Sequence, residues 1–335
     1  MKKVATSIRD FIKEEIVSIL FLILLYYILQ IPVNYYIITG GGTSNVASRI
    51  EVEDKYSEKG SFNISYVTEL QGTVMTYLLS YIIPTWEKES ADLYKFSTSD
   101  SMEDIEFRSN LDLKSANGTA TYWAYTLANK SVEKTSSKIY VISTFEEYPN
   151  SLKAQDEILE IDGKTYDTIM DYKKYLQEKE NTVKVKVLRN KKEIEIEAKL
   201  YEKKGQKILG VGLQLVNTYE TNPKVDIKFH SSESGPSGGL ITTLEIYNQL
   251  TQKDLTKGRK ITGTGTIELD GTIGTIGGVE HKLLGAEAAN TDYFLVPSGE
   301  NYETAKKYKE EKKLKTKLVE VSNIQEAIQK LEALK

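Results

Sequence analysis

Ser-Gly-Pro-Ser-Gly-Gly at residues 234–239 is the stretch that decides the fold of the C-terminal part of the chain. It follows an alternating, strand-like pattern over residues 225–229 and opens an amphipathic helical pattern from Leu240. Proline suits the first turn of a helix, and glycine lets other backbone approach closely. The hydroxyl of Ser237 and the nearby amides are therefore expected to face a substrate, and the partial positive charge of a helix N-terminus suits an oxyanion.

A second motif, Gly-Gly-Val-Glu-His-Lys at residues 277–282, opens another helical pattern. Lys282 falls in the first turn of that helix, where the positive helix terminus disfavours its charge and burial disfavours it further. Both effects would lower the pKa of Lys282 and help to make it a neutral base. A serine hydroxyl needs such a base to become a nucleophile.

Together, the two motifs resemble those of the proteolytic domain of Lon-type serine proteases, over the chain from about Gly210 to its C-terminus. In that family a Gly-Pro-Ser-small-Gly motif holds the nucleophile, and a Gly-Gly-x-x-x-Lys segment holds the base. The resemblance implies that Ser237 is the nucleophile and Lys282 the general base. It also implies supporting roles for Thr264, Gly235, Pro236 and Gly238.

Thr264 lies in the stretch Ile-Thr-Gly-Thr-Gly-Thr-Ile at residues 261–267 and corresponds to a threonine that hydrogen-bonds the lysine in this family. Two positions depart from the family pattern. Ser234 stands where many members have aspartate or glycine, and Gly238 stands where alanine is usual. Neither departure removes the nucleophile or the base.

Other catalytic chemistries have weaker support in the sequence. A Ser-His-Asp triad would have to use His230 or His281, because the chain has no other histidine. Two histidines without metal-ligand spacing do not indicate a catalytic metal. Ser-Val-Glu-Lys at residues 131–134 matches the loose S-x-x-K pattern, but the S-D-N and K-T-G elements that accompany it elsewhere are missing.

The composition limits the possible functions further. With 335 residues and 40% apolar content, the chain is long enough for two or three domains with real cores. A net charge of −4 gives no general attraction for nucleic acid, and the absence of cysteine excludes a cysteine nucleophile, a thiolate metal site and disulfides. The glycines at residues 40–42 are not followed by Gly-Lys-Ser/Thr, so we expect a flexible connection there and no ATP site.

The N-terminal stretch is apolar and uncharged from Ile16 to Val33, and four basic residues precede it. This pattern predicts one transmembrane helix that contacts the lipid bilayer through residues 16–38. The positive-inside rule then places the N-terminus in the cytoplasm and the chain after Thr39 outside the cell membrane. A cleaved signal peptide is the competing interpretation, but no small-x-small site directly follows the apolar run.

Residues 137–200 read as strand, loop, strand, helix and two alternating strands, and the string at residues 152–163 resembles a PDZ domain of the bacterial protease type. Gln155 replaces the glycine that is usual before the aspartate of this string. The resemblance implies binding of protein or peptide segments by strand addition. A small α+β spacer without a ligand is the alternative. Further upstream, a helical pattern over residues 101–129 is broken near Asn117 and Gly118.

The predicted fold class is α+β. We expect a tail and anchor at residues 1–39, an α/β segment at 40–131, a PDZ-like domain at 132–202 and a Lon-like domain at 203–335. This layout resembles the anchored, PDZ-containing Lon-like proteases of Gram-positive bacteria. It implies an ATP-independent serine endopeptidase without a cofactor that cleaves extracytoplasmic or membrane-proximal proteins. A non-catalytic PDZ-containing membrane scaffold is the alternative from another functional class, and assembly into a homo-oligomer is left open.

Overall fold

The computed structural model describes residues 2–230 and 232–334, with side chains from Glu14 onward in those ranges. The chain forms two compact units. The first holds the residues up to 40 together with residues 68–94, and the second holds residues 41–67 and the chain from residue 95. Strands β1 (Pro32–Asn45) and β3 (Ser61–Thr73) each contribute residues to both units.

The first unit contains helix α1 (Lys2–Leu29), the short helix α2 (Val74–Leu79), strand β4 (Glu87–Ser90) and a 3-10 helix over Ala91–Tyr94. Strand β4 pairs antiparallel with β1, from Tyr35 opposite Ser90 to Ile38 opposite Glu87. Helix α2 begins at a capping box, in which Thr73 and Thr76 each accept a hydrogen bond from the other's backbone amide.

The transmembrane helix expected from the N-terminal sequence is not supported. Among the helices that the structure describes, none combines the length and the apolar character needed to cross a bilayer. The physical reason is that α1 carries charges up to Glu15 and ends at Leu29, and the chain from Pro32 is a strand. The uncharged helical part is therefore shorter than the roughly 20 residues that a bilayer core requires.

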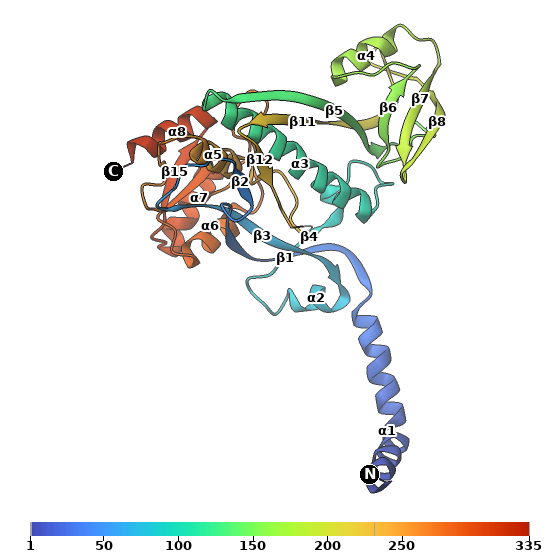
Figure 1. The fold of residues 1–335 in the computed structure, drawn as a ribbon. Coiled ribbons are helices and arrows are strands. Elements are labelled where there is room, and N and C mark those ends of the chain that lie inside the picture. Colours follow the sequence, from blue (N-terminus) through green and yellow to red (C-terminus); the bar gives the residue numbers. More distant parts are fainter. Residues whose placement is uncertain (1, 231, 335) are drawn as a thin grey trace. The chain divides into compact units, whose positions relative to one another are not determined.

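The second unit is built on a mostly parallel sheet covered by helices (Figure 1). Its central strand β13 (Lys260–Gly263) pairs in parallel with β3 on one side and with β14 (Tyr293–Pro297) on the other, and β15 (Lys317–Val321) follows β14. Helices α5 (Gly239–Leu250), α6 (Val279–Ala288), α7 (Glu300–Lys312) and α8 (Ile324–Ala333) belong to the same part of the chain. Strands β2 (Ile50–Val52) and β12 (Val225–Ile227) form a separate antiparallel pair. The mixture of helices and sheets confirms the predicted α+β class.

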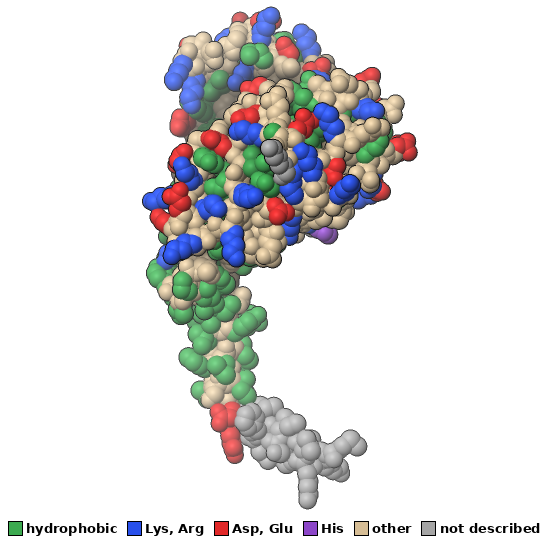
Figure 2. Space-filling view, turned by 90° about the vertical axis from the view of Figure 1, so that its left-hand side faces the viewer, with side chains coloured by type: hydrophobic (Ala, Val, Ile, Leu, Met, Phe, Trp, Pro, Cys, Tyr) green, Lys and Arg blue, Asp and Glu red, His purple; other side chains and the backbone are tan. Residues whose placement is uncertain are grey.

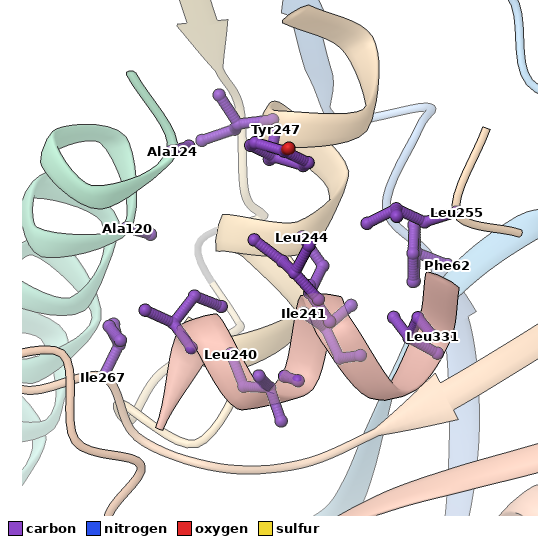
Figure 3. Close-up of a cluster of buried hydrophobic side chains, with 14 of the residues drawn as sticks. Phe62, Ala120, Ala124, Leu240, Ile241, Leu244, Tyr247, Leu255, Ile267 and Leu331 are labelled. Carbon is purple, nitrogen blue, oxygen red and sulfur yellow. The ribbon is translucent and has the colours of Figure 1, made fainter. Parts of the chain in front are cut away.

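Helix α5 lies at the centre of this unit, and all twelve of its residues are buried. Figure 3 shows its apolar side chains between Ala120 and Ala124 of helix α3 (Met102–Leu127) and Leu331 of α8. Burying a leucine or isoleucine side chain stabilises a fold by about 2 kcal/mol, so a helix buried on every side is a major part of the core. Helix α3 runs unbroken through Gly118, and the break expected there is wrong.

The PDZ-like part is a five-stranded antiparallel sheet in the order β11-β5-β6-β7-β8. Its strands are β5 (Ser131–Thr144), β6 (Glu157–Ile161), β7 (Thr182–Arg189), β8 (Lys192–Lys199) and β11 (Val211–Asn222). Helix α4 (Ile169–Gln177) packs its buried tyrosines against this sheet, and the hairpin β9–β10 (Tyr201–Lys203 and Gln206–Ile208) lies beside the end of α4. Strand β11 is at the edge of the sheet, although it lies beyond residue 202, where the sequence analysis placed the end of the PDZ-like domain.

A carboxyl group, Glu245, is buried on helix α5. Its Oε1 accepts a hydrogen bond from Nε2 of Gln249 at 2.5 Å, whereas Oε2 has no hydrogen-bond partner among the described residues. Burial raises the pKa of Glu245 from 4.5 to about 7, and the nearby carboxylate of Glu58 acts in the same direction. Between pH 4.5 and about 7, the folded protein therefore holds a proton at Glu245 that the unfolded chain has already released.

We predict that the free energy of unfolding falls as the pH rises from about 4.5 to 7, because ionising Glu245 is harder in the folded state. Glu245→Gln should remove this part of the pH dependence and stabilise the protein by about 2 kcal/mol above pH 7. Urea denaturation at several pH values measures both effects. Glu310→Gln, at an exposed position on α7, is the matched control. A Glu245→Gln variant with the pH dependence of the original chain would contradict the prediction.

Candidate active site

The turn that carries Ser237 is held by backbone hydrogen bonds on both sides. The amide of Gly235 donates to the carbonyl of Ser109 on α3 at 2.9 Å, and the backbone of Gly235 has a positive φ of 82° that suits glycine. The carbonyl of Pro236 accepts from the amide of Gly239 at 3.0 Å. No side chain caps the N-terminus of α5, and Ser237 itself is half-buried. The first turn of α5 thus follows Ser237 directly in the chain and has no capping side chain.

Strand β13 and the loop after it fix the backbone of Ser237 from the other side. The carbonyl of Ser237 accepts hydrogen bonds from the amide of Gly265 at 2.8 Å and from Oγ1 of Thr264 at 3.3 Å. The amide of Leu240 donates to the carbonyl of Gly265 at 3.0 Å, which ties the first turn of α5 to the same loop. Thr264 therefore supports the serine turn directly, while its expected hydrogen bond to Lys282 stays a prediction.

Helix α6 carries Lys282 and begins after Gly278, whose left-handed backbone has a φ of 64°. The amide of Lys282 donates to the carbonyl of Gly278 at 3.1 Å, so the lysine closes the first turn of the helix. The residue is buried, with 4% of its surface exposed. Oγ of Ser65 on β3 donates to the Lys282 carbonyl at 2.8 Å, and this bond fixes the helix against the sheet.

Gly41 of strand β1 packs against helix α6. A Cβ atom at Gly41 would lie 2.4 Å from the carbonyl oxygen of His281, and one at Gly285 would lie 2.7 Å from the backbone of Gly41. Backbone touches backbone here, which any side chain on these residues would prevent. The flexible connection expected at residues 40–42 is therefore wrong, because these glycines are strand residues and Gly41 lets α6 approach.

Strand β3 joins the two motifs. A Cβ atom at Gly238 would lie 2.8 Å from Cδ1 of Ile64, and the next residue of the strand, Ser65, holds the carbonyl of Lys282. Consecutive strand residues are only about 3.3 Å apart along the strand. The structure thus attaches the serine turn and the lysine helix to the same short length of one strand, on its two faces, because successive side chains of a strand point to opposite faces. The sequence predicted a strand over residues 61–68 but gave no signal that it serves this site.

The two histidines occupy different positions. His230 is exposed, and its backbone amide donates to Glu233, whereas His281 is half-buried on α6 next to Lys282. Within the described residues, no three His, Cys, Asp or Glu side chains form a group that could hold a metal ion.

Comparison with known proteins identifies the two parts of the chain. Residues 215–334 match the profile of the Lon protease (S16) C-terminal proteolytic domain, and residues 130–200 match that of the PDZ domain. A Lon protease from Aster yellows witches'-broom phytoplasma is 34% identical over 92 residues, which cover 28% of this chain and 11% of that protein. The chain is therefore similar to a PDZ domain over residues 130–200 and to a Lon-type proteolytic domain over residues 215–334, and these matches support a serine peptidase.

Two solved structures are similar to the PDZ part. The PDZ domain of the SdrC-like protein from Listeria monocytogenes is 31% identical, with a TM-score of 0.21, and the match covers 22% of this chain and 85% of that chain. The corresponding domain from Listeria innocua is 33% identical, with a TM-score of 0.22, and the match covers 23% of this chain and 92% of that one.

The contact between Gly238 and Ile64 generates a testable prediction about the serine turn. Gly238→Ala should destabilise the protein by about 1–2 kcal/mol, because the new methyl group meets Cδ1 of Ile64. Ile64→Val removes that atom and should cost about 1 kcal/mol alone. The double variant should lose less stability than the sum of the losses in the two single variants. The expected difference in urea denaturation is about 0.5 kcal/mol or more. Strict additivity would show that the two side chains do not share this space.

Proposed function

We propose that the chain is an ATP-independent serine endopeptidase in which Ser237 is the nucleophile and Lys282 the general base. The observation that carries this proposal is the attachment of both motifs to consecutive residues of β3, Ile64 and Ser65. The burial of Lys282 in the first turn of α6 adds support. Burial and the positive end of the helix both favour an uncharged amine there, and only an uncharged amine can accept a proton.

In the proposed reaction, Lys282 takes the proton from Oγ of Ser237 while that oxygen attacks the peptide carbonyl carbon. Backbone amides at the uncapped N-terminus of α5 hold the oxyanion of the tetrahedral intermediate. When the C–N bond breaks, Lys282 gives its proton to the leaving amine. Lys282 then takes a proton from water, which attacks the acyl-enzyme ester, and the proton returns to Ser237 as the acid product leaves.

The PDZ part is proposed to bind the substrate at the outer edge of β11. Among the described strands, β5 is the one that pairs with β11, so the other edge of β11 has no strand partner there and is the proposed place for a peptide strand. Val211 and Leu213 on β11 pack against the cluster that includes Leu176 of α4, which makes the neighbouring wall apolar. The positive φ of 66° at Gly210 gives a turn at the start of β11 where backbone amides could meet a terminal carboxylate. The proposed substrates are proteins with extended or loosened tails.

We also propose that α1 attaches the chain to the surface of the cell membrane, with its exposed apolar side chains in the lipid interface. Apolar side chains cover the face of α1 that Figure 2 shows, and most of the apolar residues from Ile16 to Ile28 are exposed. Val17 is 76% exposed, and Phe21 is 62% exposed. A helix with apolar residues all round is typical of a buried or lipid-embedded segment.

Ser237→Ala and Lys282→Met should each lower the rate of peptide cleavage about a thousandfold or more, because each removes one partner of the proton transfer. Cleavage of an unfolded protein such as casein, followed by mass spectrometry with and without added ATP, measures this loss. Ser234→Ala is the matched control on the same turn and should keep most of the activity. Full activity in the Ser237→Ala variant would exclude this mechanism. If the original chain cleaves no substrate, the result would favour the non-catalytic scaffold.

Membrane attachment predicts that the full chain floats with vesicles of phosphatidylglycerol and phosphatidylethanolamine. Replacing Leu20 and Leu24 of α1 by lysine should abolish flotation, because a charge in the lipid interior costs about 2–3 kcal/mol per residue. Leu269→Lys, at an exposed leucine in the second unit, should leave flotation unchanged. Equal flotation of the Leu20/Leu24 variant would contradict attachment through α1.

A further inference from the structure

Helix α3 is a support shared by the PDZ sheet and the serine turn. It runs along strands β5 and β11 on one side and contacts α5 on the other. The sequence placed this helix in the α/β segment at residues 40–131 and left open whether that segment belongs to the catalytic domain. The contacts of α3 fix the position of the PDZ part in relation to Ser237. Helix α3, the PDZ part and Ser237 all belong to the second compact unit.

A buried ion pair at the start of α3 is hydrogen-bonded to β5. Nη1 of Arg108 lies 2.8 Å from Oδ2 of Asp100, and both side chains are almost fully buried. Arg108 also donates to the carbonyl of Ile142 at 2.8 Å, and Oγ of Ser143 donates to Asp100 at 2.9 Å. A buried pair with its hydrogen bonds satisfied is costly to break, because one charge would be left without its partner. Strand β5 is therefore held firmly on α3.

The contacts between α3 and the rest of the PDZ part add to this attachment. Nε2 of Gln214 on β11 donates to Asp112 at 2.8 Å, and a Cβ atom at Gly118 would lie 2.7 Å from the carbonyl oxygen of Asn217. Gln155 has a left-handed φ of 74°, which glycine would adopt at lower cost, yet its side chain donates to Asp104 of α3 at 3.2 Å. The residue that departs from the PDZ pattern thus makes a contact that glycine cannot make.

These contacts define a short path from the peptide edge to the nucleophile. Asp112, which holds Gln214, is three residues from Ser109, or about 4.5 Å along the helix axis. The carbonyl of Ser109 holds the amide of Gly235, two residues before Ser237. This series of contacts limits the separation of Gln214 and Ser237 to about 25 Å or less, which about eight extended residues can span.

We propose that the protease cleaves at a fixed reach, about a dozen residues upstream of a substrate C-terminus bound at the start of β11. This inference rests on the proposed peptidase function and on peptide binding at β11. A carboxylate held near Gly210 makes the substrate run antiparallel to β11, toward the body of the unit, and about four residues bring it level with Gln214. About eight more residues reach Ser237. The fixed attachment to α3 keeps this distance constant.

The test uses a series of unstructured peptides of repeated Ala-Leu-Lys sequence that end in a free leucine carboxylate, at total lengths from about ten to thirty residues. The full chain should cut every peptide of sufficient length at the same distance from its C-terminus. Lengthening the N-terminal side should leave that distance unchanged, and peptides shorter than the reach should be cut at least tenfold more slowly. Product masses give the cut positions, and fluorescence anisotropy of labelled peptides gives the affinity.

Three outcomes decide between the inference and the proposed function. Binding with cuts at variable distances would overturn the fixed reach and leave the peptidase function standing. Peptides that are cut equally well with an amidated C-terminus would overturn both peptide capture at β11 and the fixed reach. Failure to cut any peptide or unfolded protein would overturn the peptidase function, and the fixed reach with it.

A variant that changes the ion pair at helix α3 provides a second test. Asp100→Asn combined with Arg108→Gln removes both buried charges together and should broaden the range of cut distances without changing peptide affinity. Lys114→Gln, at an exposed position of α3, is the matched control and should keep the narrow range. An unchanged narrow range in the folded double variant would exclude this ion pair as the element that fixes the reach. If the double variant does not fold, the peptide series with the original chain still decides the question.

Discussion

The pairing of β3 with β13 is the interaction on which the candidate site depends. Ser61 lies opposite Lys260 and Ile64 opposite Gly263, so a strand from the N-terminal half is inserted beside the strand that leads to Thr264. Pairing two strands that are about 200 residues apart in the sequence costs loop-closure entropy, which other contacts in the folded unit must offset. The benefit is positional, because Ile64 touches the serine turn and Ser65 holds the lysine helix.

Close backbone approach is the second constraint, and it explains why glycines surround the site. Gly238 lies against Ile64, and Gly41 and Gly285 bring strand β1 and helix α6 into backbone contact. At each contact a Cβ atom would have no space unless its neighbour moved. Glycine allows the close approach, but it loses more conformational entropy on folding than other residues do. The glycine at 238, where alanine is usual in Lon-type domains, is consistent with an isoleucine rather than a smaller neighbour at 64.

The sequence was most informative where structure is local. The strands of the PDZ part, the turn before α5 and the start of α6 follow from periodicity and from glycine and proline positions, and the structure places elements there. It was least informative where partners are distant. Nothing local shows that residues 61–64 pair with Lys260–Gly263, or that Ser109 holds Gly235. The length of α1 was also misjudged, because apolar composition continues past Leu29 although the helix does not.

Within the described residues, strands β5 and β11 run continuously from the PDZ sheet to the contacts with α3, and no flexible linker lies between them. Under the proposed function, geometry rather than linker statistics would therefore set the local concentration of a bound tail at Ser237. A tail that is too short cannot reach the nucleophile however tightly it binds, and a folded domain close to the bound end would be held away from it. Binding and cleavage would then select different features of the same substrate. Binding would depend on its end, and cleavage would depend on how many residues before that end are free to extend.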